Sequence, residues 1–337
     1  MEEKFSAFRR HGLQSLLALG LTGMAGKIAF AAKDDSSGYP SRPIRCIVPF
    51  PPGGTTDILT RQITRPMSEL LGVSIIVENI SGAGGVIGTA AAARAPADGY
   101  TLTEGNIATH AISVILNPNA GYDPVRDFEP ISLIAHIPNY LIVNSSIGVD
   151  SVPELIAYLS DNPAMRQYAS AGVGTSPHLA GALFSRSLNI KLTHVPYKGS
   201  TPALTDIASG VIPFMFDQKT AALPFFKSGK VKLLAVTTDS RVPFDKDLPT
   251  LSEQGFPGLS VSSWHALYAP KGVPQAVVAK LNSCVLQALS QPEIIKQLTE
   301  LYGMRVVGST PDELKALTEA EIKRWRPILA ENEIVSE

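Results

Sequence analysis

The stretch "IVPFPPGGTTDILTRQI", residues 47–63, joins an apolar run to a helical pattern through two prolines, two glycines and two threonines. The apolar run is typical of a buried strand, and the pattern after Thr56 is typical of an amphipathic helix. A strand that turns directly into a helix indicates a βα unit. Glycine lets a ligand approach the backbone closely, because it has no Cβ. The stretch therefore predicts an α/β fold with a ligand at this turn.

The alternation of strands and helices continues beyond this turn. Residues 73–80 and 99–105 are strand-like, and an Ala-rich helical segment lies between them. This order predicts a parallel sheet with helices on its faces. A second α/β unit begins at Ser151. Its "SVPELIAYLSDN" has a serine N-cap, an early proline and a glutamate at the third helical position, which predict a helix start.

Two long extended segments, residues 131–146 and 261–272, connect the two units. Such connections indicate two domains that exchange strands. We expect a ligand cleft between them, where strand ends and helix N-termini converge. The expected boundaries are residues 40–142 plus 265–337 for domain 1 and residues 143–264 for domain 2.

The overall composition is that of an ordinary globular protein. The chain has 337 residues, of which 45% are hydrophobic and 18% charged, and this length suffices for two domains. The formal net charge of −1 shows no basic footprint, so nucleic acid is not an expected partner.

The first 32 residues have the pattern of a signal peptide. A basic start with Arg9 and Arg10 precedes the apolar "GLQSLLALGLTGMAG", and "AFAA" at residues 29–32 supplies small residues for cleavage. The apolar run is shorter than the roughly 20 residues of a membrane span. We expect a soluble exported protein that uses the Sec route or, given the paired arginines, the twin-arginine route. An amphipathic N-terminal helix of a cytosolic protein is the alternative.

The two cysteines, Cys46 and Cys284, lie among apolar neighbours in different segments. Two cysteines make neither a disulfide framework nor a zinc site. Two buried thiols are the favoured interpretation, and a disulfide bridge in an oxidising compartment is the alternative.

Four small-residue loops stand directly before helical segments. Helix N-termini expose unsatisfied backbone N–H groups with partial positive charge, so such loops suit anions. Glycine also simply makes turns, but four such loops at strand ends are stronger evidence than one. They are "PPGGTTD" (51–57), "SGAGG" (81–85), "SAGVGTSPH" (170–178) and "YKGSTP" (197–202).

Cofactor binding and catalysis are poorly supported by the motifs. "GAGGVIG" is close to a dinucleotide fingerprint, but only Glu104 could nominally serve as the acidic residue that this motif requires. The sequence contains no G-x-S-x-G elbow and no clustered His or Cys ligands for a metal. His110 and His178 fit packing roles better than catalytic ones. Asp217 ends the strand-like "FMFD" and fits equally a ligand contact and a helix N-cap.

The motifs together resemble the solute receptors of tripartite tricarboxylate transporters, also called the Bug family. The resemblance runs from about Tyr39 to Trp325, and it depends on the order and spacing of motifs that are each modest alone. They are "VPFPPGGTTD", "VENISGAGGVIG", "SAGVGTSPHLAGALF", "THVPYKGSTPALTDIASG" and the segment from Gly229 to Pro274.

This resemblance implies a periplasmic binding protein of type II, with two α/β domains that close on a small carboxylate. It also implies that backbone amides of the first loop hold the carboxylate, while the second domain adds a loop and the aspartate of "FMFD". Carried onto this chain, the implied ligand-binding residues are Pro52, Gly53, Gly54, Thr55, Thr56, Asp57, Ser170, Gly174, Thr175, Ser176, His178 and Asp217.

Three residues depart from the family pattern. Ile80 and Ser81 replace an Arg-Pro pair, which removes a positive charge, and Glu104 stands where the family usually has an apolar residue. If Glu104 faces the cleft, it should disfavour a polyanion and favour a ligand with an amide or ammonium group. If it points elsewhere, it has no such effect.

The resemblance implies a receptor that delivers its ligand to the permease subunits of a membrane transporter. A sensory binding protein that presents its ligand to a sensor kinase is the alternative. An α/β enzyme acting on a carboxylate would need a nucleophile–base pair, which the sequence does not offer. We expect a monomer without cofactor or metal.

Overall fold

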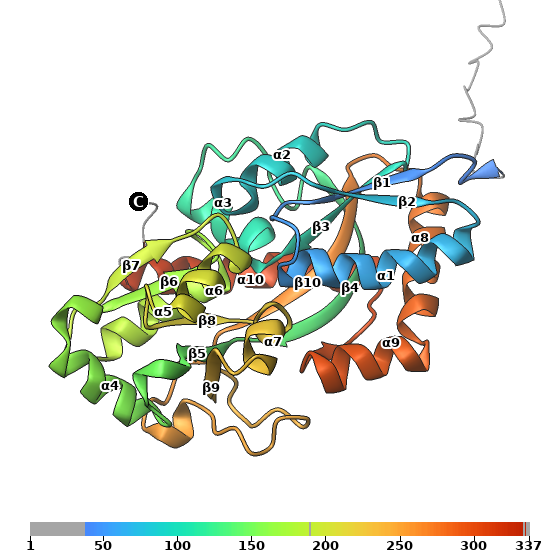
Figure 1. Ribbon diagram of the computed structural model, residues 1–337. Coiled ribbons are helices and arrows are strands. Elements are labelled where there is room, and N and C mark those ends of the chain that lie inside the picture. The colour runs from blue at the N-terminus through green and yellow to red at the C-terminus, as the bar shows by residue number, and fades with distance from the viewer. Residues whose placement is uncertain (1–37, 189, 333, 335–337) are drawn as a thin grey trace, which may run out of the picture. The chain divides into compact units, whose positions relative to one another are not determined.

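Two mixed β-sheets organise the residues that the computed structural model describes, which are 38–188, 190–332 and 334 (Figure 1). The first sheet has the strand order β11-β4-β10-β3-β1-β2, and the second has the order β7-β6-β8-β5-β9. The predicted signal peptide, residues 1–32, lies outside the described residues. The strands are β1 (Ile44–Val48), β2 (Ile75–Asn79), β3 (Thr101–Asn106), β4 (Phe128–Pro138), β5 (Tyr140–Asn144), β6 (Gln167–Ser170), β7 (Thr193–Pro196), β8 (Phe214–Asp217), β9 (Val231–Val236), β10 (Ser262–Pro270) and β11 (Arg305–Val306).

The parallel sheet that the sequence predicts is only part of the first sheet. Strands β1, β2 and β3 are parallel, but β10 pairs antiparallel with both β3 and β4. The second sheet repeats this plan, with β6, β7 and β8 parallel and β5 antiparallel to β8 and β9. The parallel pairing predicted for the first three strands is confirmed, and the long connecting segments add antiparallel strands to both sheets.

The two predicted extended segments are strands that link the sheets. Residues 131–146 contain most of β4 and the whole of β5, and only Asn139 lies between the two strands. The chain returns from β9 of the second sheet to β10 of the first, and β10 lies beside β4 over its whole length (Figure 1). Two domains, each built around one sheet, are therefore joined by two neighbouring chain segments, one between β4 and β5 and one between β9 and β10.

Local sequence signals set several helix ends. The Ser151 side chain accepts a hydrogen bond from the Glu154 N–H at the start of α4, as predicted, and Gly72 ends α1 in the left-handed conformation. The helices are α1 (Thr55–Leu71), α2 (Val86–Ala93), α3 (Ser113–Leu116), α4 (Val152–Asp161), α5 (Ser176–Ser187), α6 (Ser200–Ser209), α7 (Lys219–Lys227), α8 (Gln275–Leu289), α9 (Pro292–Lys296) and α10 (Pro311–Glu331).

Helices cover both faces of each sheet. On β5, Tyr140 and Ile142 pack with α6 and α7, whereas Leu141 and Val143 pack on the opposite face with α4 and α5. This alternation is what a strand buried on both faces requires. In the first sheet, α1 and α8 share one apolar cluster.

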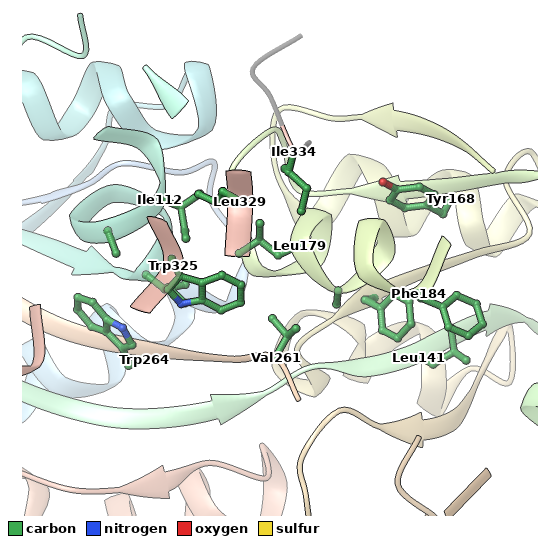
Figure 2. Packing of buried hydrophobic residues seen from close by; sticks show 14 of the residues in the cluster. Ile112, Leu141, Tyr168, Leu179, Phe184, Val261, Trp264, Trp325, Leu329 and Ile334 are labelled. Atoms are coloured by element: carbon green, nitrogen blue, oxygen red, sulfur yellow. The ribbon is translucent and has the colours of Figure 1, made fainter. Parts of the chain in front are cut away.

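The cluster on the other face of the first sheet continues into the second domain. Figure 2 shows Trp264 of β10 and Trp325 of α10 in the same group as Leu179 and Phe184 of α5. The C-terminal helix α10 therefore contributes to a core that both domains share.

Candidate functional site

A small cavity lies between the two sheets, and four helices begin at it. It encloses about 40 Å³. Its wall includes residues from the first turns of α1, α5 and α6 and the residue before α7, namely Gly54, Thr55, Thr56, Thr175, Ser176, Ser200 and Gln218. The first helix belongs to the first domain and the other three belong to the second, so the cavity is a cleft between the domains.

The four helix starts leave backbone donors available to a ligand. The N-cap residues are Gly54, Thr175, Gly199 and Gln218, and none of them caps its helix through a side-chain hydrogen bond. The first N–H groups of a helix have no partner within the helix, and the helix dipole places partial positive charge there. Four such ends around one cavity make a site for an anion.

The loop before α1 is held in place by Asp57. Its Oδ2 accepts a hydrogen bond from the Gly53 N–H at 3.0 Å, and its Oδ1 accepts from Arg61 Nε and Asn79 Nδ2, both at 2.9 Å. Burial alone would raise the pKa of Asp57, but these three donors together lower it. The carboxylate is therefore ionised at neutral pH, and it fixes the loop that lines the cavity.

The loop before α5 is held by two side chains of its own segment. His178 Nδ1 accepts from the Gly174 N–H at 3.2 Å, and the His178 ring stacks on His194 with the centroids 4.2 Å apart. Ser170 Oγ accepts from the Gly172 N–H at 3.1 Å and lies 2.7 Å from His194 Nε2. These contacts fix the backbone that leads into the α5 N-terminus.

Comparison with known proteins agrees with this geometry. Residues 59–334 match the family described as the tripartite tricarboxylate transporter family receptor. The chain belongs to this receptor family. It is 35% identical over 302 residues to Protein BugT of Bordetella pertussis, covering 89% of this chain and 92% of BugT. Members of this family are periplasmic binding proteins.

Three solved structures share the fold and most of the sequence length. The periplasmic binding protein BugD is 35% identical, with a TM-score of 0.84, covering 89% of this chain and 100% of BugD. Rpa4515 of R. palustris with adipate is 38% identical, with a TM-score of 0.85 and coverage of 88% and 99%. MatC of Rhodopseudomonas palustris with bound malate is 36% identical, with a TM-score of 0.81 and coverage of 86% and 100%. The receptor therefore has the periplasmic binding protein fold of two α/β domains, as predicted.

Five of the twelve predicted ligand-binding residues line the receptor's small cavity. They are Gly54, Thr55, Thr56, Thr175 and Ser176. Gly174 lines an adjoining cavity of about 400 Å³, which shares Phe50 and Ala171 with the first. The wall of neither cavity includes the other six, which are Pro52, Gly53, Asp57, Ser170, His178 and Asp217.

Sequence reasoning missed five polar residues of the cavity wall: Ser200, Gln218, Asn106, Ser263 and His265. Ser200 belongs to the "YKGSTP" loop, which already indicated an anion site, and Gln218 directly follows Asp217. The sequence therefore carried a signal for these two. Asn106 and His265 lie on paired strands, β3 and β10, that are far apart in the chain, and no local motif marks them.

Asp217 lies behind the cavity wall, and its side chain is fully buried. Oδ1 accepts from the Gln218 N–H at 2.8 Å, while Oδ2 has no hydrogen-bond partner among the described residues. Burial raises the pKa of Asp217 to about 7, although hydrogen bonds from the Ser200 side chain and the Gln218 backbone oppose this shift. Asp217 is therefore a much weaker acid than an exposed aspartate.

Four other residues singled out in the sequence are buried in the protein. Cys46 and Cys284 are free buried thiols, as favoured from the sequence, and burial raises the pKa of Cys46 to about 12. His110 stacks on Tyr268 at 4.0 Å inside the core, which confirms the packing role. Glu104 is fully buried below the cavity wall and contacts His265. No described helix of the receptor is long and apolar enough to cross a membrane.

A larger cavity of about 730 Å³ lies elsewhere, lined by Thr238, residues 240–244 and parts of β4, α8 and β11. Its wall is mostly apolar side chains, and it includes no residue of the four helix starts described above. Arg241, one of its cations, is already paired with Glu253. The convergent backbone donors that a small carboxylate needs are therefore at the smaller cavity.

Asn139 connects the crossing strands to the cavity. Its side chain is fully buried. Nδ2 donates to the Val261 carbonyl at 2.9 Å, and Oδ1 accepts from Ser176 Oγ at 3.2 Å and from Gln218 Nε2 at 3.1 Å. One side chain thus ties both domain connections to the starts of α5 and α7.

We expect Asn139→Ala to lower the free energy of unfolding by about 2 kcal/mol, because buried hydrogen-bonding groups lose their partner. It should also weaken ligand binding, because Ser176 and Gln218 line the cavity. Urea unfolding and calorimetric titration measure the two effects.

Asn144 provides the matched control at the opposite end of β5. It is also buried and donates to the Ile207 carbonyl at 2.7 Å, but it does not line the cavity. Asn144→Ala should cost similar stability and leave affinity unchanged. Equal affinity losses in the two variants would contradict the coupling of Asn139 to the site.

Proposed function

We propose that this receptor is exported to the periplasm, captures a small organic carboxylate in the cleft between its domains and delivers it to a tripartite tricarboxylate-type membrane transporter. The observation that carries the proposal is the convergence of four uncapped helix N-termini on one small cavity. The solved relatives with adipate and malate support a carboxylate as the ligand class. The signal-peptide pattern of residues 1–32 supports export.

The proposed ligand contacts combine both domains. Backbone donors at Gly54, Thr55 and Thr56 meet the carboxylate from the first domain, and Thr175 and Ser176 meet it from the second. Three further predicted residues act from behind the wall: Asp57 and His178 hold the two loops, and Asp217 meets the polar end of the ligand when the wall adjusts. We also propose that the chain passes from domain 1 to domain 2 at residues 142–143 and returns at residues 264–265.

Binding without chemistry suits such a site. Neutral backbone donors attract an anion without forming a permanent ion pair, and ordered water can adapt one loop to several ligands. Closure of the two domains desolvates the ligand and presents one surface built from both domains to the membrane partner.

A thermal-shift panel of the purified protein tests the proposal. Malate, adipate, other di- and tricarboxylates, acidic amino acids and aromatic acids are each compared with the corresponding amide. A carboxylate that binds the folded state should raise the unfolding midpoint, and its amide should not. Equal shifts with acid and amide, or no shift with any acid of the panel, would contradict a carboxylate receptor.

A further inference from the structure

Glu104 is a fully buried carboxyl group below the floor of the cavity. It lies on β3, whose neighbour β10 carries His265. Glu104 Oε1 is 2.6 Å from His265 Nδ1, and Oε2 accepts from Asn106 Nδ2 at 3.3 Å. Both partners line the cavity, whereas Glu104 does not. The acid therefore contacts the cleft only through these two residues.

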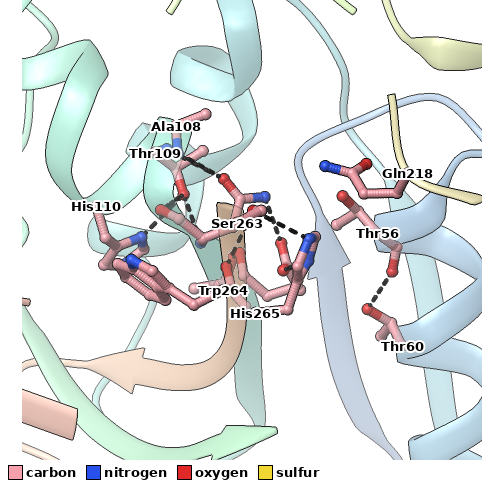
Figure 3. Close-up of polar contacts among 12 residues, drawn as sticks. Thr56, Thr60, Ala108, Thr109, His110, Gln218, Ser263, Trp264 and His265 are labelled. Carbon is pink, nitrogen blue, oxygen red and sulfur yellow. Dashed lines mark hydrogen bonds and ion pairs between the residues drawn. The ribbon is translucent and has the colours of Figure 1, made fainter. Parts of the chain in front are cut away.

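His265 is held with one ring nitrogen toward the acid. Nδ1 is engaged by Glu104, and Nε2 lies 3.4 Å from Ser263 Oγ, which is long for a hydrogen bond to a hydroxyl group. Figure 3 shows His265 and Ser263 with Thr56 of α1 and Gln218 of the second domain nearby. Nε2 is therefore the ring atom left to meet a ligand in the cavity.

The surrounding backbone makes this arrangement rigid. Asn106 Oδ1 accepts from the Ala108 N–H at 2.9 Å and from the Thr109 N–H at 3.3 Å, which fixes the amide that also donates to Glu104. The histidine side chain is only 3% exposed. A ring this confined presents the same atom to every ligand that enters.

Resting on the function proposed above, we propose that the Glu104–His265 pair, which shares one proton between Oε1 and Nδ1, takes up one additional proton at His265 Nε2 when a carboxylate binds, and that this Nε2–H donates to the ligand carboxylate. Glu104 is the positioning residue and His265 is the ligand contact. Without the additional proton the pair carries a net negative charge, and the lone pair of Nε2 faces the anionic ligand. With it the pair is neutral, and Nε2 is a donor. A carboxylate therefore selects the protonated state, and affinity falls as rising pH removes the proton.

The other titratable groups around the pair keep their charge between pH 6 and pH 9. Burial raises the pKa of Cys46 on β1 to about 12 and moves that of Tyr268 on β10 well above its usual range. Burial lowers the pKa of His110, which stacks on Tyr268, to about 3. The carboxylate of Asp57 at the α1 start has a lowered pKa and remains ionised.

Asp217 is the exception, because its pKa of about 7 lies in this window. The test therefore uses Asp217→Asn as the parent protein, whatever its absolute affinity. Malate and adipate are titrated into it by calorimetry at four pH values from 6 to 9, in buffers of different ionisation enthalpy. The dependence of the heat on the buffer measures the protons taken up per ligand bound.

Three variants are compared with this parent. Glu104→Gln removes the charge that stabilises the imidazolium, so proton uptake should move to lower pH and the Kd should no longer change with pH between pH 7 and pH 9. His265→Gln replaces the imidazole with an amide, which can donate a hydrogen bond but cannot titrate, so the variant should show neither proton uptake nor a pH-dependent Kd. Glu129→Gln is the matched control, because Glu129 is also buried but pairs with Lys271 outside the cavity wall.

The expected parent result is proton uptake that approaches one per ligand at alkaline pH, with a Kd that rises by about tenfold per pH unit there. A flat Kd without proton uptake, or a Glu104→Gln variant that behaves like its parent, would overturn the inference and leave the carboxylate receptor standing. Failure of the parent and of the wild-type protein to bind any acid of the panel would overturn both proposals. Melting curves verify folding. The double variant Glu104→Gln/His265→Gln, in which two amides can hydrogen-bond to each other, is used in place of any single variant that does not fold.

Discussion

Gly84→Ala should reduce carboxylate affinity at least 100-fold, which corresponds to roughly 2.7 kcal/mol. Gly84 lies in the "SGAGG" loop of the first domain, and a Cβ added there would stand 2.5 Å from the backbone carbonyl oxygen of Val173 in the second domain. Real Cβ contacts essentially never occur below 3.0 Å, and a backbone atom cannot rotate away. The domains would therefore stop short of the closed arrangement, and ligand contacts from the two sides would not form together. Calorimetric titration measures the affinity, and small-angle scattering with and without ligand measures closure.

Gly72→Ala is the matched control for this variant. Gly72 has a φ of 69° and Gly84 a φ of 62°, so alanine meets similar backbone strain at both positions, on the order of 1 kcal/mol. A Cβ at Gly72 has nothing within 4 Å. Both variants should lose similar stability, and only Gly84→Ala should lose affinity. If the two variants bind within threefold of each other, close approach of the domains at Gly84 is not needed for binding.

The helix ends and the extended connections could be predicted from sequence because their causes are local. Ser151 and Gly72 each act on backbone groups within a few residues, so the letters alone indicate the cap. The segment around Asn139 could be predicted to be extended, but the role of that side chain could not. Its partners Ser176, Gln218 and Val261 are 37, 79 and 122 positions away.

The candidate site divides in the same way. Gly54, Thr55, Thr175 and Ser176 stand at loop-to-helix junctions, and such junctions are visible as small residues before an amphipathic pattern. The contact between Glu104 and His265 spans 161 positions and depends on the pairing of β3 with β10. Sequence reasoning marked Glu104 as unusual but could not say whether it faces the cleft, because the direction of a strand side chain depends on the register of the whole sheet.

Two short elements could not be predicted from the sequence either. Residues Ala108–Ile112 form a single wide π-type turn after β3, and β11 is only two residues long. Neither has enough length for a hydrophobic period to show. The turn nevertheless matters, because it places the Ala108 and Thr109 N–H groups against Asn106 in the cavity wall.

Asp217→Asn should gain stability relative to the wild type as pH rises. The free energy of unfolding of the variant minus that of the wild type should be about 3 kcal/mol larger at pH 8 than at pH 5. Burial raises the pKa of Asp217 from 3.8 to about 7. Between these two values the folded state holds a proton that the unfolded state has released. The stability of the wild type therefore falls as pH rises from about 4 to about 7 and is flat above. Asparagine cannot titrate, so the variant does not share this loss, and urea unfolding at the two pH values measures it.

Asp57→Asn gives the opposite case beside the same cavity. The pKa of Asp57 is lowered, so its carboxylate contributes stability that is lost only as pH falls below its ordinary pKa. The difference between Asp57→Asn and wild type should therefore be the same at pH 5 and pH 8. A constant difference for Asp217→Asn as well would mean that Asp217 has an ordinary acidity, and its unpartnered Oδ2 would then reach solvent. A growing difference would mean that the cleft keeps a neutral carboxyl group beside four positive helix ends, ready to accept an anion without charge repulsion.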